Sequence, residues 1–100
     1  MVKLISESSE IPKQGAVVID FFATWCGPCK RIAPTFEKLA DSLTSIQFFK
    51  VDVDESPELV NEFDVSAMPT FVFLKDGQVV KRVEGADMAA LESGFDLLTK

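Results

Sequence analysis

Apolar and polar positions divide the chain into blocks that have the periods of strands and helices. Residues 2–5 form a short apolar run. Residues 16–23 form a longer one that is rich in β-branched and aromatic side chains, which is typical of a strand covered on both faces. Residues 47–53 alternate with a period of two. The first half of the chain therefore predicts three strands.

Two more strands are predicted in the second half, over residues 70–75 and 78–84. Asp76-Gly77 between them is a strong signal for a hairpin with a two-residue turn. These two strands are therefore expected to pair antiparallel.

Three helical segments separate or follow these strands. Ser56-Pro57 predicts an N-cap and a proline at the first position of the middle helix. Pro34 is expected to kink the first helix. Asp87 can cap the last helix, and Gly94 is expected to weaken that helix by ~1 kcal/mol relative to alanine. In the first and last helices, apolar positions recur at steps of three and four. In the first helix these positions are Ile32, Phe36, Leu39, Ala40 and Leu43. In the last helix they are Met88, Leu91, Phe95 and Leu98, which are expected to face inward.

The order of these elements predicts an α/β fold. Strand–helix–strand units followed by a hairpin give a central mixed β-sheet with helices on both faces. A chain of 100 residues suffices for one domain, so we expect a single domain over residues 1–100.

Histidine is absent and there are two cysteines, which narrows the chemistry open to the chain. A Ser-His-Asp triad, a Cys-His dyad, a histidine metal ligand and a four-thiolate zinc site are all excluded, so we expect no metal site. The net charge of −6 argues against nucleic-acid binding, which needs clustered lysine and arginine. Beyond that, the acidic balance indicates only solubility.

No apolar stretch approaches the ~20 residues that span a bilayer, so we expect no membrane association. The first residues also lack the hydrophobic run of a signal peptide, which favours a reducing, cytoplasmic location. In such a compartment a close cysteine pair is more often catalytic or metal-binding than structural.

The segment Trp25-Cys26-Gly27-Pro28-Cys29 falls between a buried strand and a helix. A helix N-terminus stabilises an anion, so a thiolate at Cys26 is favoured and its pKa is expected below that of free cysteine. The two sulfurs can meet, so one can attack an external disulfide and the other can release the client. Gly27 permits close approach of a partner backbone, and Pro28 stiffens the turn and biases the redox potential. Half a zinc site and an inert bridge are the alternatives.

Asp20 lies inside the apolar run and is a candidate proton acceptor. If it is buried, desolvation raises its pKa, and the carboxyl group could exchange protons near neutrality. The alternative is an aspartate that merely alternates outward.

Taken together, these motifs resemble the thioredoxin family, and the resemblance covers essentially the whole chain. It rests on blocks that stand in the family's order. They are Asp20 to Lys30 (DFFATWCGPCK), Pro34, Lys50 to Asp54 (KVDVD), Ala67 to Phe71 (AMPTF), Asp76-Gly77 and Gly85-Ala86.

The resemblance implies the thioredoxin fold and a protein dithiol–disulfide oxidoreductase active in electron transport and cell redox homeostasis. Reduced Cys26 would attack a client disulfide, and Cys29 would resolve the mixed disulfide and leave a redox-active Cys26–Cys29 bridge. A flavin-containing thioredoxin reductase would return electrons from NADPH, so the chain itself would bind no cofactor. The implied partners are this reductase and disulfide-containing client proteins, and the chain would act as a monomer.

The resemblance also implies roles outside the cysteine pair. Asp20 would be a buried base behind Cys29. Lys50, on the neighbouring strand, could pair with Asp20 and moderate its pKa. The alternative is that Lys50 is a surface lysine without a role at the site. Met68-Pro69 would be a cis peptide opposite the cysteines. Because most peptide bonds before proline are trans in folded proteins, the alternative is a trans proline that starts a strand.

A client would then bind as an extended segment hydrogen-bonded to the backbone of Met68. The shallow apolar groove would be formed by Trp25, Gly27, Pro28, Ala67, Met68, Pro69, Gly85 and Ala86. The alternatives are that Met68 fills the core and that Gly85 only ends a strand.

Three positions depart from the family's pattern. Residues 6–15 leave room for one turn of helix at most, where the family has a longer first helix. Phe22 stands where many members have a second tryptophan. Glu84 places a carboxylate beside the groove, where it could disfavour acidic clients or point away.

Two rival functions follow from the same residues. One is a secretory oxidase or isomerase, which the Gly-Pro pair between the cysteines and the absence of a signal sequence disfavour. The other is a redox-switched binding module that holds a partner through Trp25, Met68 and Pro69.

Overall fold

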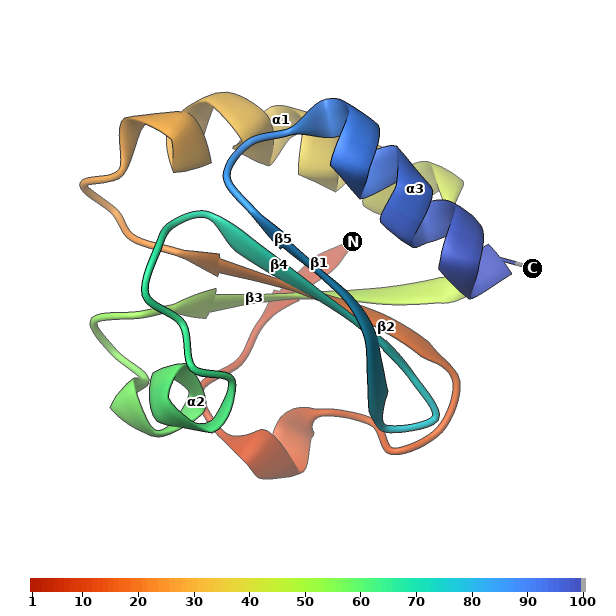
Figure 1. Ribbon diagram of the computed structural model, residues 1–100, viewed down its shortest axis with the longest axis horizontal. Coiled ribbons are helices and arrows are strands. Elements are labelled where there is room, and N and C mark those ends of the chain that lie inside the picture. The colour runs from red at the N-terminus through yellow and green to blue at the C-terminus, as the bar shows by residue number, and fades with distance from the viewer. Residues whose placement is uncertain (100) are drawn as a thin grey trace.

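The computed structural model describes residues 1–99, and Lys100, the last residue of the expected domain, lies outside the described residues. The predicted α/β architecture is confirmed, because helices cover both faces of one mixed sheet (Figure 1). The elements in chain order are β1 (Val2–Leu4), a 3₁₀ turn (Ser8–Glu10), β2 (Ala16–Phe22), α1 (Gly27–Ser42), β3 (Ile46–Asp52), α2 (Pro57–Glu62), β4 (Thr70–Lys75), β5 (Gln78–Glu84) and α3 (Met88–Thr99).

The strands lie in the order β1-β3-β2-β4-β5. β1, β3 and β2 run parallel, whereas β4 and β5 are antiparallel to their neighbours. The predicted hairpin is confirmed, since Asp76 (φ 50°) and Gly77 (φ 82°) both have the left-handed conformation that a type I′ turn requires. β2 therefore lies at the centre of the sheet, hydrogen-bonded on both sides.

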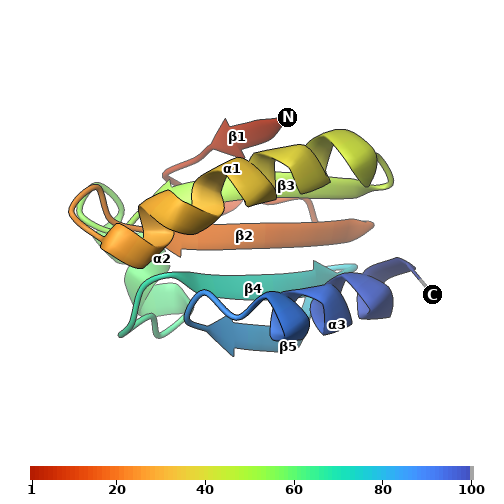
Figure 2. The same ribbon diagram turned by 90° about the horizontal axis from the view of Figure 1, so that it is seen from above.

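The two faces of the sheet carry separate apolar clusters. On one face, side chains of α1 and α3 such as Phe36 and Leu91 pack against Val18 and Phe71. Figure 2 shows α1 lying over the β3 and β2 side and α3 over the β4 and β5 side. On the opposite face, Leu59 of α2 packs in the cluster that includes the inner side chains of β2.

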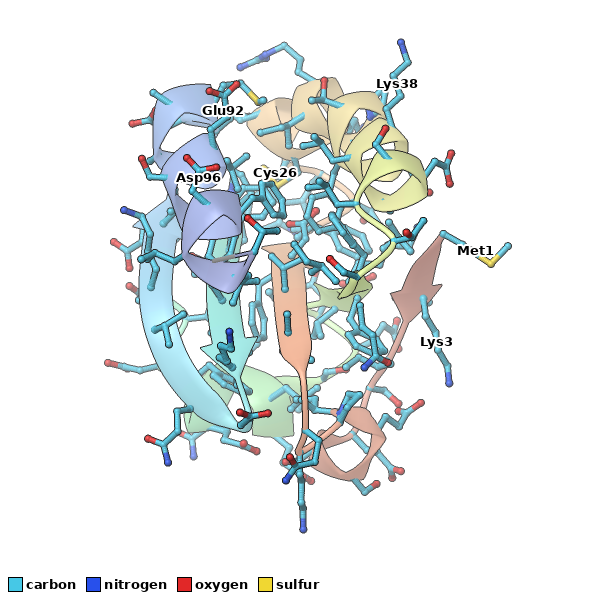
Figure 3. The ribbon with its side chains drawn as sticks, turned by 90° about the vertical axis from the view of Figure 1, so that its right-hand side faces the viewer. Met1, Lys3, Cys26, Lys38, Glu92 and Asp96 are labelled. Carbon is cyan, nitrogen blue, oxygen red and sulfur yellow. A yellow bond between two sulfur atoms is a disulfide. The ribbon has the colours of Figure 1, made fainter. Side chains whose placement is uncertain are left out.

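Phenylalanine rings tie the elements of the first face together. Phe36 of α1 and Phe95 of α3 both contact Phe48 of β3, with ring centroids 5.1 and 5.5 Å apart. Phe95 also meets Phe73 of β4 edge-on at 5.2 Å. Side chains fill the space between these helices and the sheet, whereas Lys38 and Glu92 project from the outer surfaces (Figure 3). These ring contacts hold α1, which carries the cysteine pair, in place.

Two features of α3 differ from the prediction. Met88 was expected to face inward, but it is 38% exposed, because the first residue of the helix lies at a crevice beside α1 instead of entering the core. Gly94 is buried, and a Cβ at this position would lie 2.5 Å from the ring of Phe73. The glycine therefore permits the close approach of α3 to β4, beyond the helix-weakening effect expected of it.

The cap predictions are partly confirmed. The Asp87 carboxylate accepts a hydrogen bond from the Ala90 N–H at 3.1 Å and so caps α3, as predicted. Ser56 is the N-cap residue of α2, but its buried hydroxyl makes no capping hydrogen bond. α1 continues through Pro34, so the predicted kink stays a prediction. No helix within residues 1–99 is long and apolar enough to cross a bilayer.

Candidate redox site

The cysteine pair lies where β2 gives way to α1. Cys26 is the N-cap residue of α1, with extended backbone angles, and its Sγ accepts the N–H of Cys29 at 3.2 Å. A disulfide joins the two residues, whose Cα atoms are 5.3 Å apart. The exposed fractions are 5% for Cys26 and 4% for Cys29. The predicted meeting of the two sulfurs at a helix N-terminus is therefore present.

Asp20 is buried in β2, the central strand of the sheet. It is 5% exposed, and within residues 1–99 its Oδ1 has no hydrogen-bond partner. Burial raises the pKa of Asp20 from its ordinary 3.8 to about 7, and the charge of Lys50 lowers it in part. Of the two interpretations left open by the sequence, the buried one is correct, and the carboxyl group can exchange a proton near neutral pH.

Lys50 is the register partner of Asp20 across β2 and β3. It is half-buried, with Nζ 6.0 Å from the centre of the Phe22 ring. No ion pair joins Lys50 to Asp20 in the part of the chain that the structure describes. Lys50 therefore acts on Asp20 through its charge and not through a direct contact.

One cavity of about 290 Å³ connects the buried carboxyl group with the second cysteine. Its lining is mainly apolar and includes Asp20, Cys29 and Lys50. The remaining wall is formed by Phe22, Ala23, Thr24, Lys30, Ala33, Phe36 and Glu37. Glu37 was not expected at the site because it belongs to no pattern singled out above, and the only signal for Thr24 was its membership of the block from Asp20 to Lys30. The space is large enough for water molecules to carry a proton between Asp20 and Cys29.

The peptide bond between Met68 and Pro69 is cis, as the resemblance implied. The side chain of Met68 packs against the cluster that contains Cys26 and Cys29. The Gly85 N–H donates to the Pro69 carbonyl at 2.8 Å, and the Thr70 hydroxyl donates to the Ala67 carbonyl at 2.5 Å. The loop before β4 is therefore held beside the cysteines by the strands that follow it.

The other residues of the predicted groove are largely accessible. Trp25 is 66% exposed, and its Nε1–H donates to Asp54 Oδ2 at 3.0 Å. Gly27, Ala67 and Ala86 are exposed, whereas Pro28 and Gly85 are half-buried. Ala86 also borders a separate shallow crevice of about 210 Å³ with Arg31 and Met88. The client groove itself stays a prediction.

Two charged residues near the site were not singled out from the sequence. Asp54 orients the indole of Trp25, and its only signal was membership of the block from Lys50 to Asp54. Arg82 of β5 contacts the carboxylate of Glu84 at 3.3 Å, so that carboxylate turns toward Arg82. Strand periodicity places Arg82 and Glu84 at neighbouring positions on one face of β5, but it does not predict that their side chains touch.

These elements define a class of protein. A buried pair of cysteines at a helix N-terminus, with a carboxyl group of raised pKa behind it, is suited to thiol–disulfide exchange. Within residues 1–99 no group of three or more histidine, cysteine, aspartate or glutamate residues could hold a metal ion.

Comparison with known proteins agrees with this class. The thioredoxin family model matches residues 5–96. Thioredoxin-1 of Schizosaccharomyces pombe is 46% identical over 99 residues, which cover 95% of this chain and 96% of the relative. Mitochondrial thioredoxin-3 of Saccharomyces cerevisiae is 50% identical over 85 residues, which cover 85% of this chain and 67% of the relative.

The same architecture occurs in solved structures. The crystal structure of oxidised mitochondrial thioredoxin 3 from Saccharomyces cerevisiae aligns with a TM-score of 0.90 and 44% identity, covering 97% of this chain and 95% of that one. The chain therefore belongs to the thioredoxin family and is a dithiol–disulfide oxidoreductase with the thioredoxin fold.

Proposed function

We propose that this chain reduces disulfides of client proteins through Cys26 and Cys29 in two exchange steps. In the first step, the Cys26 thiolate attacks a client disulfide, so a Cys26–client bond forms and the client's S–S bond breaks. In the second step, Cys29 attacks the Cys26 sulfur, closes the Cys26–Cys29 bridge and releases the second client thiolate. Two electrons pass to the client, and its two thiolates take up the two protons given up by the cysteines.

The observation that carries this proposal is the position of Cys26 at the N-cap of α1. There the Sγ atom accepts the Cys29 N–H, and the partial positive charge of a 16-residue helix favours a thiolate. Gly27 leaves the approach to Cys26 open, and Pro28 restricts the turn.

Asp20 is proposed as the base that serves Cys29. It borders the same cavity, and with a pKa of about 7 it is partly ionised at neutral pH and can accept the Cys29 proton, directly or through water. Lys50 is proposed to favour the ionised carboxylate through its charge. The catalytic set is therefore Cys26, Cys29, Asp20 and Lys50.

Clients are proposed to bind as an extended segment along Trp25, Met68 and cis-Pro69, with Ala67, Gly85 and Ala86 completing the groove. The exposed indole of Trp25 and the half-buried, flexible thioether of Met68 suit recognition of many sequences. A flavin-containing thioredoxin reductase is proposed to return electrons from NADPH to the Cys26–Cys29 bridge.

An insulin-reduction assay tests the activity, first with dithiothreitol and then with a thioredoxin reductase and NADPH. We expect turnover in both, and no turnover in either would contradict the proposal. In the Cys29→Ser variant, clients should accumulate as covalent adducts at Cys26, and a Cys26→Ser control should trap none. A partner that Cys26→Ser holds unchanged would instead indicate a non-covalent binding module.

We further propose that residues 1–100 form a single domain that acts as a monomer in the cytoplasm. The match of the family model over residues 5–96 supports a single domain. The compartment needs its own test, because thioredoxin-3 of Saccharomyces cerevisiae is a mitochondrial relative. Light scattering after gel filtration tests the monomer, and fractionation of the source cells tests the compartment.

A further inference from the structure

The short helix α2 ends in a turn whose carbonyl groups need partners from elsewhere. Asp64 follows the C-cap residue Phe63 with φ 52°, and the Val65 N–H donates to the Val60 carbonyl at 2.9 Å. This is a Schellman-type ending with a non-glycine residue in the left-handed position. Such an ending satisfies carbonyls inside the helix and leaves those of Phe63 and Asp64 without a helical donor.

Arg82 supplies donors to both of these carbonyls. Its Nη2 donates to the Asp64 carbonyl at 2.6 Å, and its Nη1 donates to the Phe63 carbonyl. The Arg82 side chain is 33% exposed, and Nε contacts Glu84 at 3.3 Å, which holds the guanidinium from the other side. The planar guanidinium therefore bridges β5 and the end of α2.

The clamped turn leads directly into the loop that borders the cysteine pair. Only Val65 and Ser66 separate Asp64 from Ala67, and Met68 then packs against the cluster of Cys26 and Cys29. The far end of this loop is held by the Gly85 N–H, which donates to the Pro69 carbonyl. Arg82 and Gly85, both at the end of β5, thus fix the two ends of residues 64–69.

We propose that Arg82 is a positioning residue for client binding: its guanidinium clamps the end of α2 to β5 and so fixes the wall of the groove formed by Ala67 and Met68. Arg82 touches neither cysteine, so it acts through the backbone of residues 64–69. This inference rests on the proposed function, because it assigns the groove to client disulfides.

The variants Arg82→Met and Arg82→Lys test this role, with Lys81→Met as the matched control. Methionine keeps an unbranched stem and removes the donors, whereas lysine retains a cation that can donate to the same carbonyls. Lys81 is the preceding residue of β5 and makes no side-chain hydrogen bond or ion pair within residues 1–99. Each variant is assayed with insulin, which must occupy the groove, and with the small disulfide DTNB.

For Arg82→Met we expect the KM for insulin to rise roughly three- to tenfold, as for loss of one charged hydrogen-bonded anchor, with a much smaller change in kcat. The fall in kcat/KM should be several-fold larger for insulin than for DTNB. Arg82→Lys should lie between the parent and Arg82→Met, and Lys81→Met should match the parent. A purely structural role would lower kcat/KM equally for both substrates or for neither, and either result would overturn the inference.

Native-state hydrogen exchange gives a second, independent readout. In Arg82→Met the amide protons of Val65 and Gly85 should exchange faster relative to those of β2, because the loop that they anchor has lost one support. Unchanged relative protection of both amides would also overturn the inference. A parent protein that reduced neither disulfide would refute the proposed function, and the exchange measurement would still decide whether Arg82 holds the loop.

Discussion

Replacing Asp20 by asparagine should abolish one specific part of the pH dependence of stability. The carboxyl group is 5% exposed, and burial raises its pKa from 3.8 to about 7. The folded state therefore binds the proton more tightly than the unfolded state. As pH rises from about 4 to about 7, the unfolded chain loses this proton first, and the native state is progressively destabilised.

The size of the effect follows from the two pKa values. A carboxyl group with pKa 3.8 in the unfolded chain and about 7 in the native state costs the native state roughly 4 kcal/mol once it is ionised. Between pH 5 and pH 8 the stability of Asp20→Asn relative to the parent should therefore rise by about 3 kcal/mol. Any cost of burying the amide adds a constant offset and leaves this change intact.

Urea unfolding of the oxidised proteins, followed by far-UV circular dichroism at several pH values, measures the difference. Asp96→Asn on the exposed face of α3 is the matched control, and its difference from the parent should not change with pH over this range. The reasoning would be refuted if the Asp20→Asn difference were flat between pH 5 and pH 8. It would also fail if the Asp96→Asn control reproduced the same rise.

Three further predictions test the chemistry and the packing. Asp20→Ala should slow the release of client from the Cys26 mixed disulfide and remove the increase of that rate with pH near 7, which single-turnover kinetics can measure; an unchanged rate across pH would exclude Asp20 as the base. Gly94→Ala should destabilise the fold by about 2 kcal/mol, because its Cβ would lie 2.5 Å from the Phe73 ring. This cost should shrink in a Phe73→Leu background, whereas Ser93→Ala on the exposed side should change the free energy of unfolding by less than about 0.5 kcal/mol. Gly77→Ala should cost about 1 kcal/mol in urea unfolding because φ is +82° in the β4–β5 turn, and equal stability of the Gly77→Ala and Gly77→Asn variants would contradict the turn argument.

Local patterns were sufficient to predict most of the fold. The apolar run of residues 16–23 predicted β2 to within one residue, and the Asp76-Gly77 signal predicted the β4–β5 hairpin with its correct bounds. The junction of strand and helix likewise placed Cys26 at a helix N-terminus. These features depend on residues adjacent in sequence, so period and turn chemistry determine them.

Features that depend on distant residues were less predictable. Periodicity alone left the burial of Asp20 undecided, because burial requires α1 to cover that face of the sheet. Gly94 could be interpreted only as a weak helix position until Phe73 of β4 was placed beneath it. The role of Arg82 could not be predicted from local patterns, because the carbonyl groups that it binds lie 18 and 19 residues earlier in the chain.

The separation between a core of phenylalanine rings and a single exposed indole has a spectroscopic consequence. The sequence contains nine phenylalanines, no tyrosine and one tryptophan, Trp25, which directly precedes Cys26. Near-ultraviolet fluorescence excited at 295 nm therefore originates beside the reactive disulfide and in no other part of the molecule. Changes in its intensity will report the oxidation state of the cysteines and the arrival of a client, and the phenylalanine rings of the interior contribute nothing to this signal.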